Sequence, residues 1–187
     1  MADTYDFSKL QCLVVDDNRH MRVLVKTILH SLGVKISREA EDGADAIKEL
    51  STFPTDFAIV DWMMDPLNGI DFARLVRNAS DSPNPYLPII MLTGHTETQR
   101  IMDARDAGVT EFLAKPISAK ALFQRIVEII ERPRPFVRTA TYFGPNRRRS
   151  TDTTKYRGPE RRKGEIEKKG GDENLSQEEI EALLSGD

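Results

Sequence analysis

The stretch CLVVDD, residues 12–17, places an apolar run directly before two adjacent carboxylates. Segments with apolar residues three and four positions apart follow it, in the manner of amphipathic helices. Strict alternation of five apolar strands with five such helices predicts a doubly wound (βα)5 parallel sheet with helices on both faces. The other four strand-like runs are VKIS at 34–37, FAIV at 57–60, PIIML at 88–92 and EFLA at 111–114.

Polar side chains follow four of these runs, at the sheet edge where the chemistry of such folds collects. They are Asp16 and Asp17 after the first run, Asp61 after the third, Thr93 after the fourth and Lys115 after the fifth. Convergent carboxylates repel one another unless a cation lies between them, and their oxygen ligands suit Mg²⁺. With Lys115 to neutralise a phosphoryl group and the Thr93 hydroxyl to donate to it, the set suits phosphoryl transfer onto a carboxylate.

Composition limits the classes of protein that fit. The chain of 187 residues allows one domain of ordinary size and a tail. Its single cysteine, Cys12, excludes an internal disulfide, favours a reducing compartment and is expected in the core. The first residues lack an export signal, and no apolar stretch approaches the roughly 20 residues of a membrane span, so we expect a cytoplasmic protein. The last 55 residues suit neither an enzyme nor a DNA-reading domain.

Four motifs, VVDDN, IVDWMM, MLTG and LAKP, in this order and spacing, resemble the receiver domain of two-component response regulators, close to the chemotaxis CheY family. The resemblance covers about residues 9–132 and implies the flavodoxin/CheY-like fold. It implies that Asp61 accepts phosphate from a histidine kinase, which would be the chain's only catalytic event. It also implies that Asp16, Asp17, Asp61 and the Met63 carbonyl hold Mg²⁺, that Thr93 and Lys115 contact the phosphoryl group, and that Lys115–Pro116 is cis.

Two positions depart from the family pattern. Asp65 stands where the family has a proline, and Pro66 comes one residue later, although Gly69 is in its usual place. We expect an acidic side chain beside the pocket to slow phosphorylation or dephosphorylation. Phe112 stands where related proteins often carry a tyrosine that rotates inward with Thr93, so an aromatic switch would lack its hydroxyl.

Charge divides the chain into three blocks. The net charge is −5 over residues 1–132, +8 over residues 133–169 and −6 over residues 170–187. Pro133 and Pro135 are expected to end the last helix, and the segment 136–171 has too few aliphatic residues to fold without a ligand. We therefore predict a receiver domain at 1–132, an arginine-rich disordered nucleotide-binding segment at 133–171, and an acidic tail with a short amphipathic helix at 172–187.

One phrase occurs twice in the basic block, as YFGPNRRR from Tyr142 and as YRGPERRK from Tyr156. A duplicated phrase suggests a two-fold ligand, and a cyclic dinucleotide presents two purines and two phosphates. Arginine forks bind guanine edges and phosphates, and aromatic rings stack on bases. The spacings RxxxR and RxxD within this block resemble elements of cyclic di-GMP receptors. The residues assigned to the nucleotide are Tyr142, Phe143, Arg147, Arg148, Arg149, Asp152, Tyr156, Arg157, Arg161 and Arg162.

This arrangement of receiver and arginine-rich tail resembles the Cle clade of CheY-like proteins. The resemblance implies an adaptor that binds cyclic di-GMP and engages the flagellar motor switch protein, with recruitment to the flagellar base. A conventional phosphorylation-dependent response regulator remains an alternative, as does a basic tail that binds nucleic acid or protein nonspecifically. We expect no specific nucleic-acid recognition.

The last stretch, NLSQEEIEALLSGD at 174–187, has the pattern of a short amphipathic helix. Ser176 and Glu179 form a capping box, and apolar residues follow at helical spacing. The stretch resembles the N-terminal segment of the flagellar switch protein FliM, which docks on CheY. The resemblance implies that residues 175–184 bind a receiver face, either this chain's own or that of another CheY-like protein. A solubilising acidic tail is the open alternative.

Overall fold

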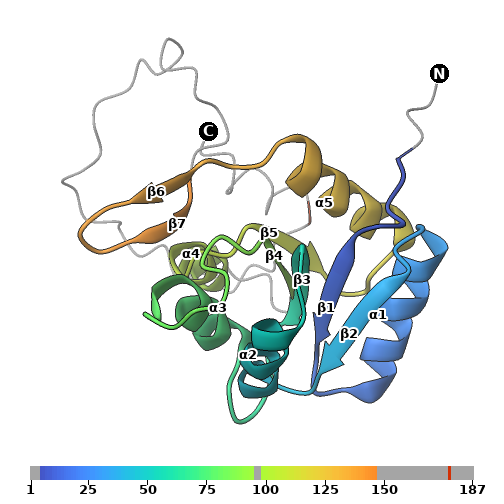
Figure 1. Ribbon diagram of the computed structural model, residues 1–187, viewed down its shortest axis with the longest axis horizontal. Coiled ribbons are helices and arrows are strands. Elements are labelled where there is room, and N and C mark those ends of the chain that lie inside the picture. The colour runs from blue at the N-terminus through green and yellow to red at the C-terminus, as the bar shows by residue number, and fades with distance from the viewer. Residues whose placement is uncertain (1–4, 95–97, 147–176, 178–187) are drawn as a thin grey trace.

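The computed structural model describes residues 5–94, 98–146 and 177. Within them, five strands form one parallel sheet in the order β2-β1-β3-β4-β5 (Figure 1). β2 and β5 are therefore the edges of the sheet. The strands are β1 (Gln11–Val15), β2 (Ile36–Ala40), β3 (Phe57–Asp61), β4 (Ile89–Thr93) and β5 (Glu111–Ala114).

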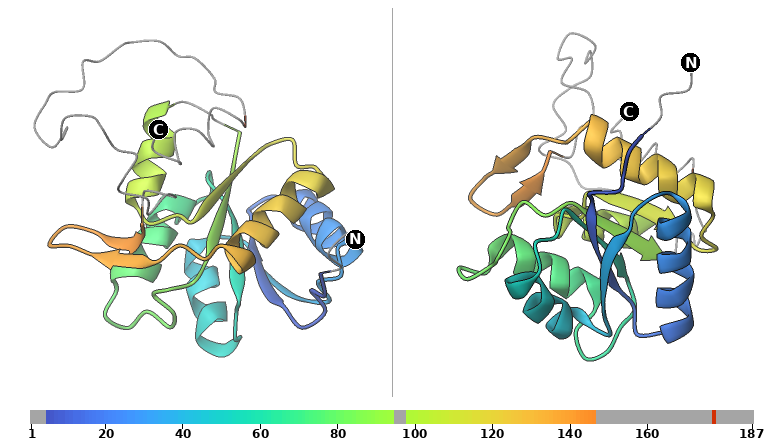
Figure 2. Two further views of the ribbon diagram at one scale, coloured as in Figure 1. Left: turned by 90° about the horizontal axis from the view of Figure 1, so that it is seen from above. Right: turned by 45° about the vertical axis from the view of Figure 1, so that its right-hand side comes forward.

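Five helices alternate with these strands and cover both faces of the sheet (Figure 2). Cys12 and Val14 of β1 face one way and pack with residues of α1 and α5, whereas Leu13 and Val15 face the layer of α2, α3 and α4. The predicted doubly wound (βα)5 fold is thus confirmed, and Cys12 is fully buried, which raises the pKa of its thiol. The helices are α1 (Arg19–Ser31), α2 (Gly43–Thr52), α3 (Gly69–Asn78), α4 (Thr98–Asp106) and α5 (Ala119–Glu131).

Side-chain caps fix the points at which the chain leaves a strand and enters a helix. The Asn18 side chain accepts the backbone N–H groups of His20 and Met21 at the start of α1. Asn68 accepts the N–H of Asp71 at the start of α3. Such caps satisfy backbone donors that have no partner inside the helix. Asn18 also donates its own N–H to Asp16 Oδ1 over 2.9 Å, so the cap of α1 holds the acidic loop after β1.

The second strand lies further along the chain than the sequence predicts. The apolar run at 34–37 pointed to a strand there, but β2 begins at Ile36 and pairs with β1 from Gln11↔Ile36 to Val15↔Ala40. β2 is an edge strand and carries Arg38 and Glu39 on its exposed part. An edge strand has a neighbouring strand on one side only, so more of its residues are exposed. Apolar residues are therefore a poor guide to the bounds of β2.

The predicted disorder from residue 136 is wrong for the first eleven residues of that segment. β6 (Phe136–Arg138) and β7 (Phe143–Pro145) form an antiparallel hairpin that lies beside α3 (Figures 1 and 2). The hairpin is closed at its base by the Asn146 N–H, which donates to the Pro135 carbonyl over 2.8 Å. The rest of the predicted disordered segment and the acidic tail, apart from residue 177, lie outside the described residues.

Aromatic contacts dock the hairpin on the receiver. Phe143 is only 6% exposed, and its ring meets Tyr86 edge to face with 5.3 Å between centroids. Phe136 lies 5.1 Å from the Tyr86 ring and 5.6 Å from the Phe143 ring. The guanidinium of Arg138 lies over Phe143 at 4.0 Å, which adds a cation–π contact. These residues bury enough apolar surface to order a segment whose aliphatic content is low.

Arg77 of α3 contacts both the hairpin and the two loops beside it. Its side chain is 2% exposed and donates to the carbonyls of Gly108, Pro85 and Leu87 over 3.0, 3.0 and 2.7 Å. Burial lowers the pKa of its guanidinium to about 10. The same group lies 5.1 Å from the Phe136 ring. Arg77 therefore joins the loop before β4, the loop before β5 and the hairpin.

A buried ion cluster holds the chain as it leaves α5. Glu111, at the start of β5, pairs with Arg125 of α5 over 3.2 Å and with Arg134 over 3.0 Å. The three side chains are 2%, 7% and 8% exposed. Removing one partner of such a cluster leaves an uncompensated buried charge. The cluster therefore fixes the path from the receiver to the hairpin.

No helix among the described residues is both long and apolar enough to span a membrane.

Candidate functional site: an acidic pocket

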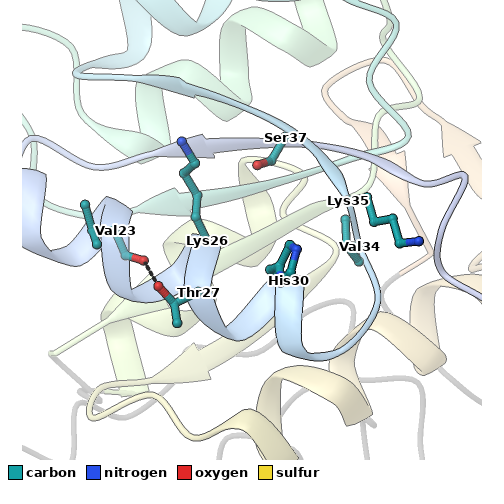
Figure 3. Close-up of a pocket in the computed structure, with 7 residues that line it drawn as sticks. All are labelled: Val23, Lys26, Thr27, His30, Val34, Lys35 and Ser37. Atoms are coloured by element: carbon teal, nitrogen blue, oxygen red, sulfur yellow. Dashed lines mark hydrogen bonds between the residues drawn. The ribbon is translucent and has the colours of Figure 1, made fainter.

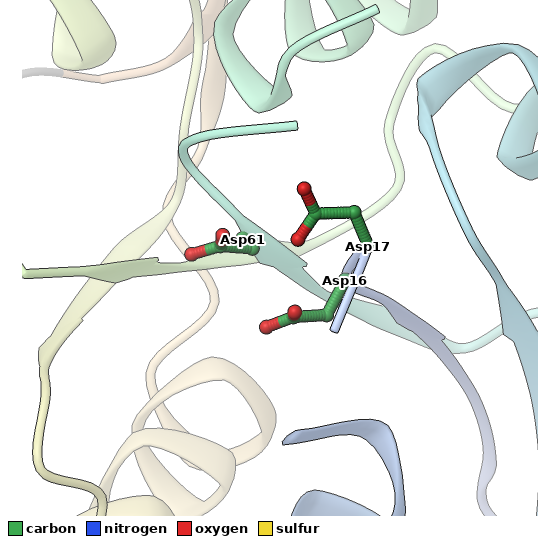
Figure 4. A group of neighbouring side chains, drawn as sticks. All are labelled: Asp16, Asp17 and Asp61. Carbon is green, nitrogen blue, oxygen red and sulfur yellow. The ribbon is translucent and has the colours of Figure 1, made fainter. Parts of the chain in front are cut away.

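Three carboxylates meet where β1 and β3 end. Asp16 and Asp17 follow β1, Asp61 is the last residue of β3, and each offers an oxygen within 4.8 Å of the others (Figure 4). Asp16 is 1% exposed and Asp61 is 6% exposed, whereas Asp17 is open to solvent. The sequence prediction that these residues converge is therefore confirmed.

Lys115 closes the pocket from the end of β5. Its Nζ lies 2.8 Å from Asp61 Oδ1 and 3.4 Å from Asp16 Oδ2. The Lys115 backbone N–H donates to the carbonyl of Thr93, the last residue of β4, over 2.8 Å. Thr93 is fully buried, and the Lys115–Pro116 bond is cis, as the resemblance implied. A second cis bond, Asp65–Pro66, was not predicted.

The pKa values of Asp16 and Lys115 are both raised, but for different reasons. Burial raises the pKa of Asp16, and the charge of Asp61 adds to this, against the lowering by the Asn18 N–H and Lys115. Burial alone would lower the pKa of Lys115, but its hydrogen bonds and charge interactions with Asp61 and Asp16 outweigh it and raise that pKa. The pocket thus carries more negative charge than Lys115 alone can offset.

The donor set fits a magnesium ion. Asp16, Asp17 and Asp61 supply carboxylate oxygens, which are the ligands that Mg²⁺ takes in proteins, and one side of the set is open to water. When bound, Mg²⁺ would neutralise charge that builds up on phosphoryl oxygens. The role assigned to the Met63 carbonyl stays a prediction; the Met63 side chain is 56% exposed.

A glycine sets the position of the Asp61 backbone. A Cβ at Gly69 would lie 2.2 Å from the Asp61 carbonyl oxygen, closer than real Cβ contacts allow. The Gly69 N–H donates to the Trp62 carbonyl over 3.1 Å. The loop after β3 can therefore close on Asp61 only with glycine at this position. Asp65, the departure from the family pattern, lies in this loop with an exposed side chain.

Sequence reasoning missed a residue that positions the acidic loop. Arg22 of α1 is 5% exposed and donates to the Asp16 carbonyl over 2.9 Å. Its guanidinium also pairs with Glu39 over 3.4 Å and Glu41 over 2.8 Å. No local signal marks Arg22, because its partners come from a loop and a strand that the fold brings to it.

Phe112 occupies an inward position. Its ring is fully buried in the core cluster on the side of α2, α3 and α4. The suggestion that it acts as an aromatic switch remains a prediction.

A separate hollow lies at the β2 edge of the sheet, between α1 and β2 (Figure 3). Its volume is about 540 Å³, and its lining includes Lys26, His30 and Lys35 together with the apolar side chains of Val23 and Val34. Lys26 makes a long ion pair of 3.9 Å with Glu39. The described residues that line the hollow include no carboxylate, so it does not suit Mg²⁺ as the acidic pocket does.

Of the ten residues assigned to a nucleotide, the structure describes Tyr142 and Phe143. Phe143 is buried in the hairpin dock, so in this arrangement its ring is not available to stack on a base. Tyr142 is half-buried and donates its hydroxyl to the Pro145 carbonyl over 2.7 Å. Gly144 lets the backbone of β7 approach the backbone at Gly108, since a Cβ at residue 144 would lie 3.0 Å from the Gly108 Cα. The other eight, Arg147, Arg148, Arg149, Asp152, Tyr156, Arg157, Arg161 and Arg162, lie outside the described residues.

Comparisons with known proteins agree with this pocket and fold. Residues 12–127 match the response regulator receiver domain family. The chemotaxis protein CheY of Pseudomonas aeruginosa is 37% identical over 123 residues, which cover 66% of this chain and 98% of that protein. CheY-3 of Vibrio cholerae is 35% identical, with 66% and 93% covered. The solved structure of Vibrio cholerae CheY4 has a TM-score of 0.59 and 28% identity, and covers 64% of this chain and 98% of that one.

Proposed function

Since the chain belongs to the response regulator receiver domain family and its receiver is CheY-like, we propose that it is a signalling adaptor that binds cyclic di-GMP. The arginine-rich segment takes up the nucleotide, and the liganded protein acts on the chemotaxis or flagellar motor machinery. The observation that carries this proposal is the repeated phrase YFGPNRRR and YRGPERRK, which sets two aromatic and arginine groups close together in the chain.

The chemistry of the phrase suits a two-fold guanine nucleotide. An arginine fork donates to guanine O6 and N7, and arginine or lysine pairs with phosphate oxygens. Tyrosine rings and guanidinium planes stack on purines without strict sequence preference. The net charge of +8 on residues 133–169 favours an anionic ligand and is reduced when that ligand binds.

The hairpin supports a division of labour between the two phrases. In the first phrase, Phe143 and Gly144 dock on the receiver, so Arg147 follows directly after a fixed point. In the second phrase, the position of Phe143 is taken by Arg157, which would not fill the same apolar site. We infer that the first phrase anchors the segment while its arginines and the second phrase contact the nucleotide.

Isothermal titration with cyclic di-GMP tests this proposal. We expect the full chain to bind and the pair Arg161→Ala and Arg162→Ala to weaken binding by at least tenfold, because charge-assisted bonds are worth about 1.5–3 kcal/mol each. The matched control is the pair Lys168→Ala and Lys169→Ala, which removes the same charge outside the phrase and should bind within about twofold of the wild type. Equal losses in both pairs would indicate nonspecific attraction and would remove the proposal.

The acidic pocket supports a second function, phosphorylation of Asp61. A carboxylate oxygen of Asp61 would attack the phosphorus of a phosphohistidine on a kinase. The P–N bond breaks, and its electron pair leaves with the imidazole, which takes a proton from solvent. Lys115, already 2.8 Å from Asp61, would then pair with the phosphoryl oxygens.

A small phosphodonor with Mg²⁺ tests this second function by mass spectrometry of the intact protein. We expect the wild type to gain the mass of one phosphoryl group and Asp61→Asn to gain none. Asp65→Asn, which changes an exposed carboxylate four residues away, is the control and should still be modified. Modification of Asp61→Asn at the wild-type rate would contradict the assignment.

A further inference from the structure

Among residues beyond Asn146, the structure describes Gln177 alone, and its side chain contacts the edge of the main sheet. The Ala114 N–H donates to Gln177 Oε1 over 3.0 Å. Gln177 Nε2 donates in turn to the Phe112 carbonyl over 3.4 Å. The two contacts join positions that are 63 and 65 residues apart in the chain.

The two backbone groups that Gln177 contacts lie on the side of β5 where no strand among the described residues pairs. β5 is the last strand of the sheet and pairs with β4 on its other side. Phe112 and Ala114 are two positions apart, so the carbonyl of one and the N–H of the other point to the same side of β5. This side faces away from β4, because the N–H of the next residue, Lys115, points the opposite way and donates to Thr93 of β4. A primary amide offers one carbonyl acceptor and N–H donors, as a peptide group does. The Gln177 carboxamide therefore takes the place of a peptide from a sixth strand.

We propose that the outer edge of β5 is a docking site for the chain's own C-terminal segment, with the carboxamide of Gln177 as its anchor. This inference does not depend on cyclic di-GMP. A strand edge with free N–H and carbonyl groups is a template for pairing with other chains. Gln177 satisfies both groups with its side chain, so these two positions of the edge are not available to another strand.

Chain length favours the chain's own segment as the occupant. Thirty residues separate Asn146 from Gln177, and such a length can reach roughly 100 Å when extended. Because the segment is part of the same chain, it meets this edge at the high effective concentration of an intramolecular ligand.

The contact lies next to the acidic pocket along the chain. Ala114 precedes Lys115, whose Nζ pairs with Asp61 and Asp16. A protein that needs the β5 edge must therefore displace the segment from a strand that ends in the pocket. The segment acts as an intrachain competitor for partners of this edge.

Amide hydrogen exchange of the full chain tests the proposal. In Gln177→Leu, exchange at Ala114 should become roughly three- to tenfold faster, the change expected from the loss of one hydrogen bond. Exchange at Lys115 should not change, because its N–H donates to Thr93 within the sheet. The control Gln124→Leu makes the same chemical change on an exposed position of α5 and should leave Ala114 as in the wild type.

A peptide of residues 172–187 supplies the second measurement. It should bind full-length Gln177→Leu, whose edge is vacated, at least fivefold more tightly than the wild type, whose edge is already occupied. The same peptide with Gln177→Leu should bind neither protein. Unchanged exchange at Ala114 in the variant would overturn the proposal. Protection of Ala114 that rises with protein concentration would also overturn it, because it would assign the contact to a second copy of the chain.

Discussion

At the scale of single residues, the buried charge of Asp16 lowers the stability of the fold, and a bound Mg²⁺ would offset this loss. Its carboxyl is 1% exposed, and burial raises its pKa above the ordinary value of 3.8. A raised pKa in the folded state means that the contribution of this group to stability is complete below 3.8 and is lost as the pH rises through the folded-state pKa. Above its folded-state pKa and without Mg²⁺, the ionised Asp16 therefore destabilises the fold.

Replacing Asp16 with Asn tests this cost. Without Mg²⁺ at neutral pH, Asp16→Asn should melt a few degrees above the wild type, the shift expected for about 1 kcal/mol in a chain of this size. The difference should vanish on acidification, when the wild-type carboxyl is protonated. Excess Mg²⁺ should stabilise the wild type and not the variant. Calorimetric scans with chelator and with Mg²⁺ measure both effects.

Asp17→Asn is the matched control for that experiment, because Asp17 is exposed and carries the same kind of carboxylate. It should weaken the response to Mg²⁺ without raising the metal-free melting temperature. A metal-free gain as large as that of Asp16→Asn would mean that burial is not the source of the cost.

The acidic residues of the pocket could be predicted from sequence because parallel strands bring their carboxyl ends to one edge. Asp16, Asp61 and Lys115 each follow an apolar run directly, so strand assignment alone places them together. Arg22 could not be found this way. It acts on a backbone carbonyl and on Glu39 and Glu41, and only the folded sheet brings these groups to α1.

At the scale of elements, the same contrast separates the buried strands from β2 and the hairpin. β3 and β4 are buried along their whole length and are apolar up to their last residues, Asp61 and Thr93, so their apolar runs mark them within one residue. β2 and the hairpin carry polar residues, and their order depends on partners elsewhere. For the hairpin those partners are Arg77 and Tyr86, which lie about 60 residues earlier in the chain. Local composition cannot report such a dock.

Phe143→Ala tests how strongly the dock holds the hairpin. The change removes a buried ring that contacts Tyr86 and Phe136, and truncation of a buried Phe costs about 3–5 kcal/mol in a closed core. We expect about 2–3 kcal/mol here, because the hairpin lies at the edge of the domain. Urea unfolding should record this loss, with rapid amide exchange between Phe136 and Asn146.

Val137→Ala, on the half-buried middle of β6, is the control for this change and should cost less than about 1 kcal/mol. If Phe143→Ala unfolds at the wild-type urea concentration and keeps its hairpin amides protected, the dock does not anchor the arginine-rich segment.

At the scale of the whole molecule, three blocks of different charge follow one another in a single chain. The acidic receiver carries −5, the basic segment +8 and the last block −6. The structure joins these blocks at two points, the hairpin that holds the start of the basic segment and the Gln177 contact on β5. A ligand of the basic segment would therefore act on a chain that is tethered to the receiver on both sides.

A titration of the isotopically labelled full chain with cyclic di-GMP, followed by two-dimensional NMR, tests the central claim most directly. We predict that the amide signals of residues 147–163 shift until the nucleotide saturates, because their arginines and Tyr156 contact it. The signals of residues 136–146 should shift with them, since the hairpin ends directly before Arg147, while those of the hollow between α1 and β2 stay in place. Signals of residues 147–163 that remain unchanged in excess nucleotide would contradict the claim.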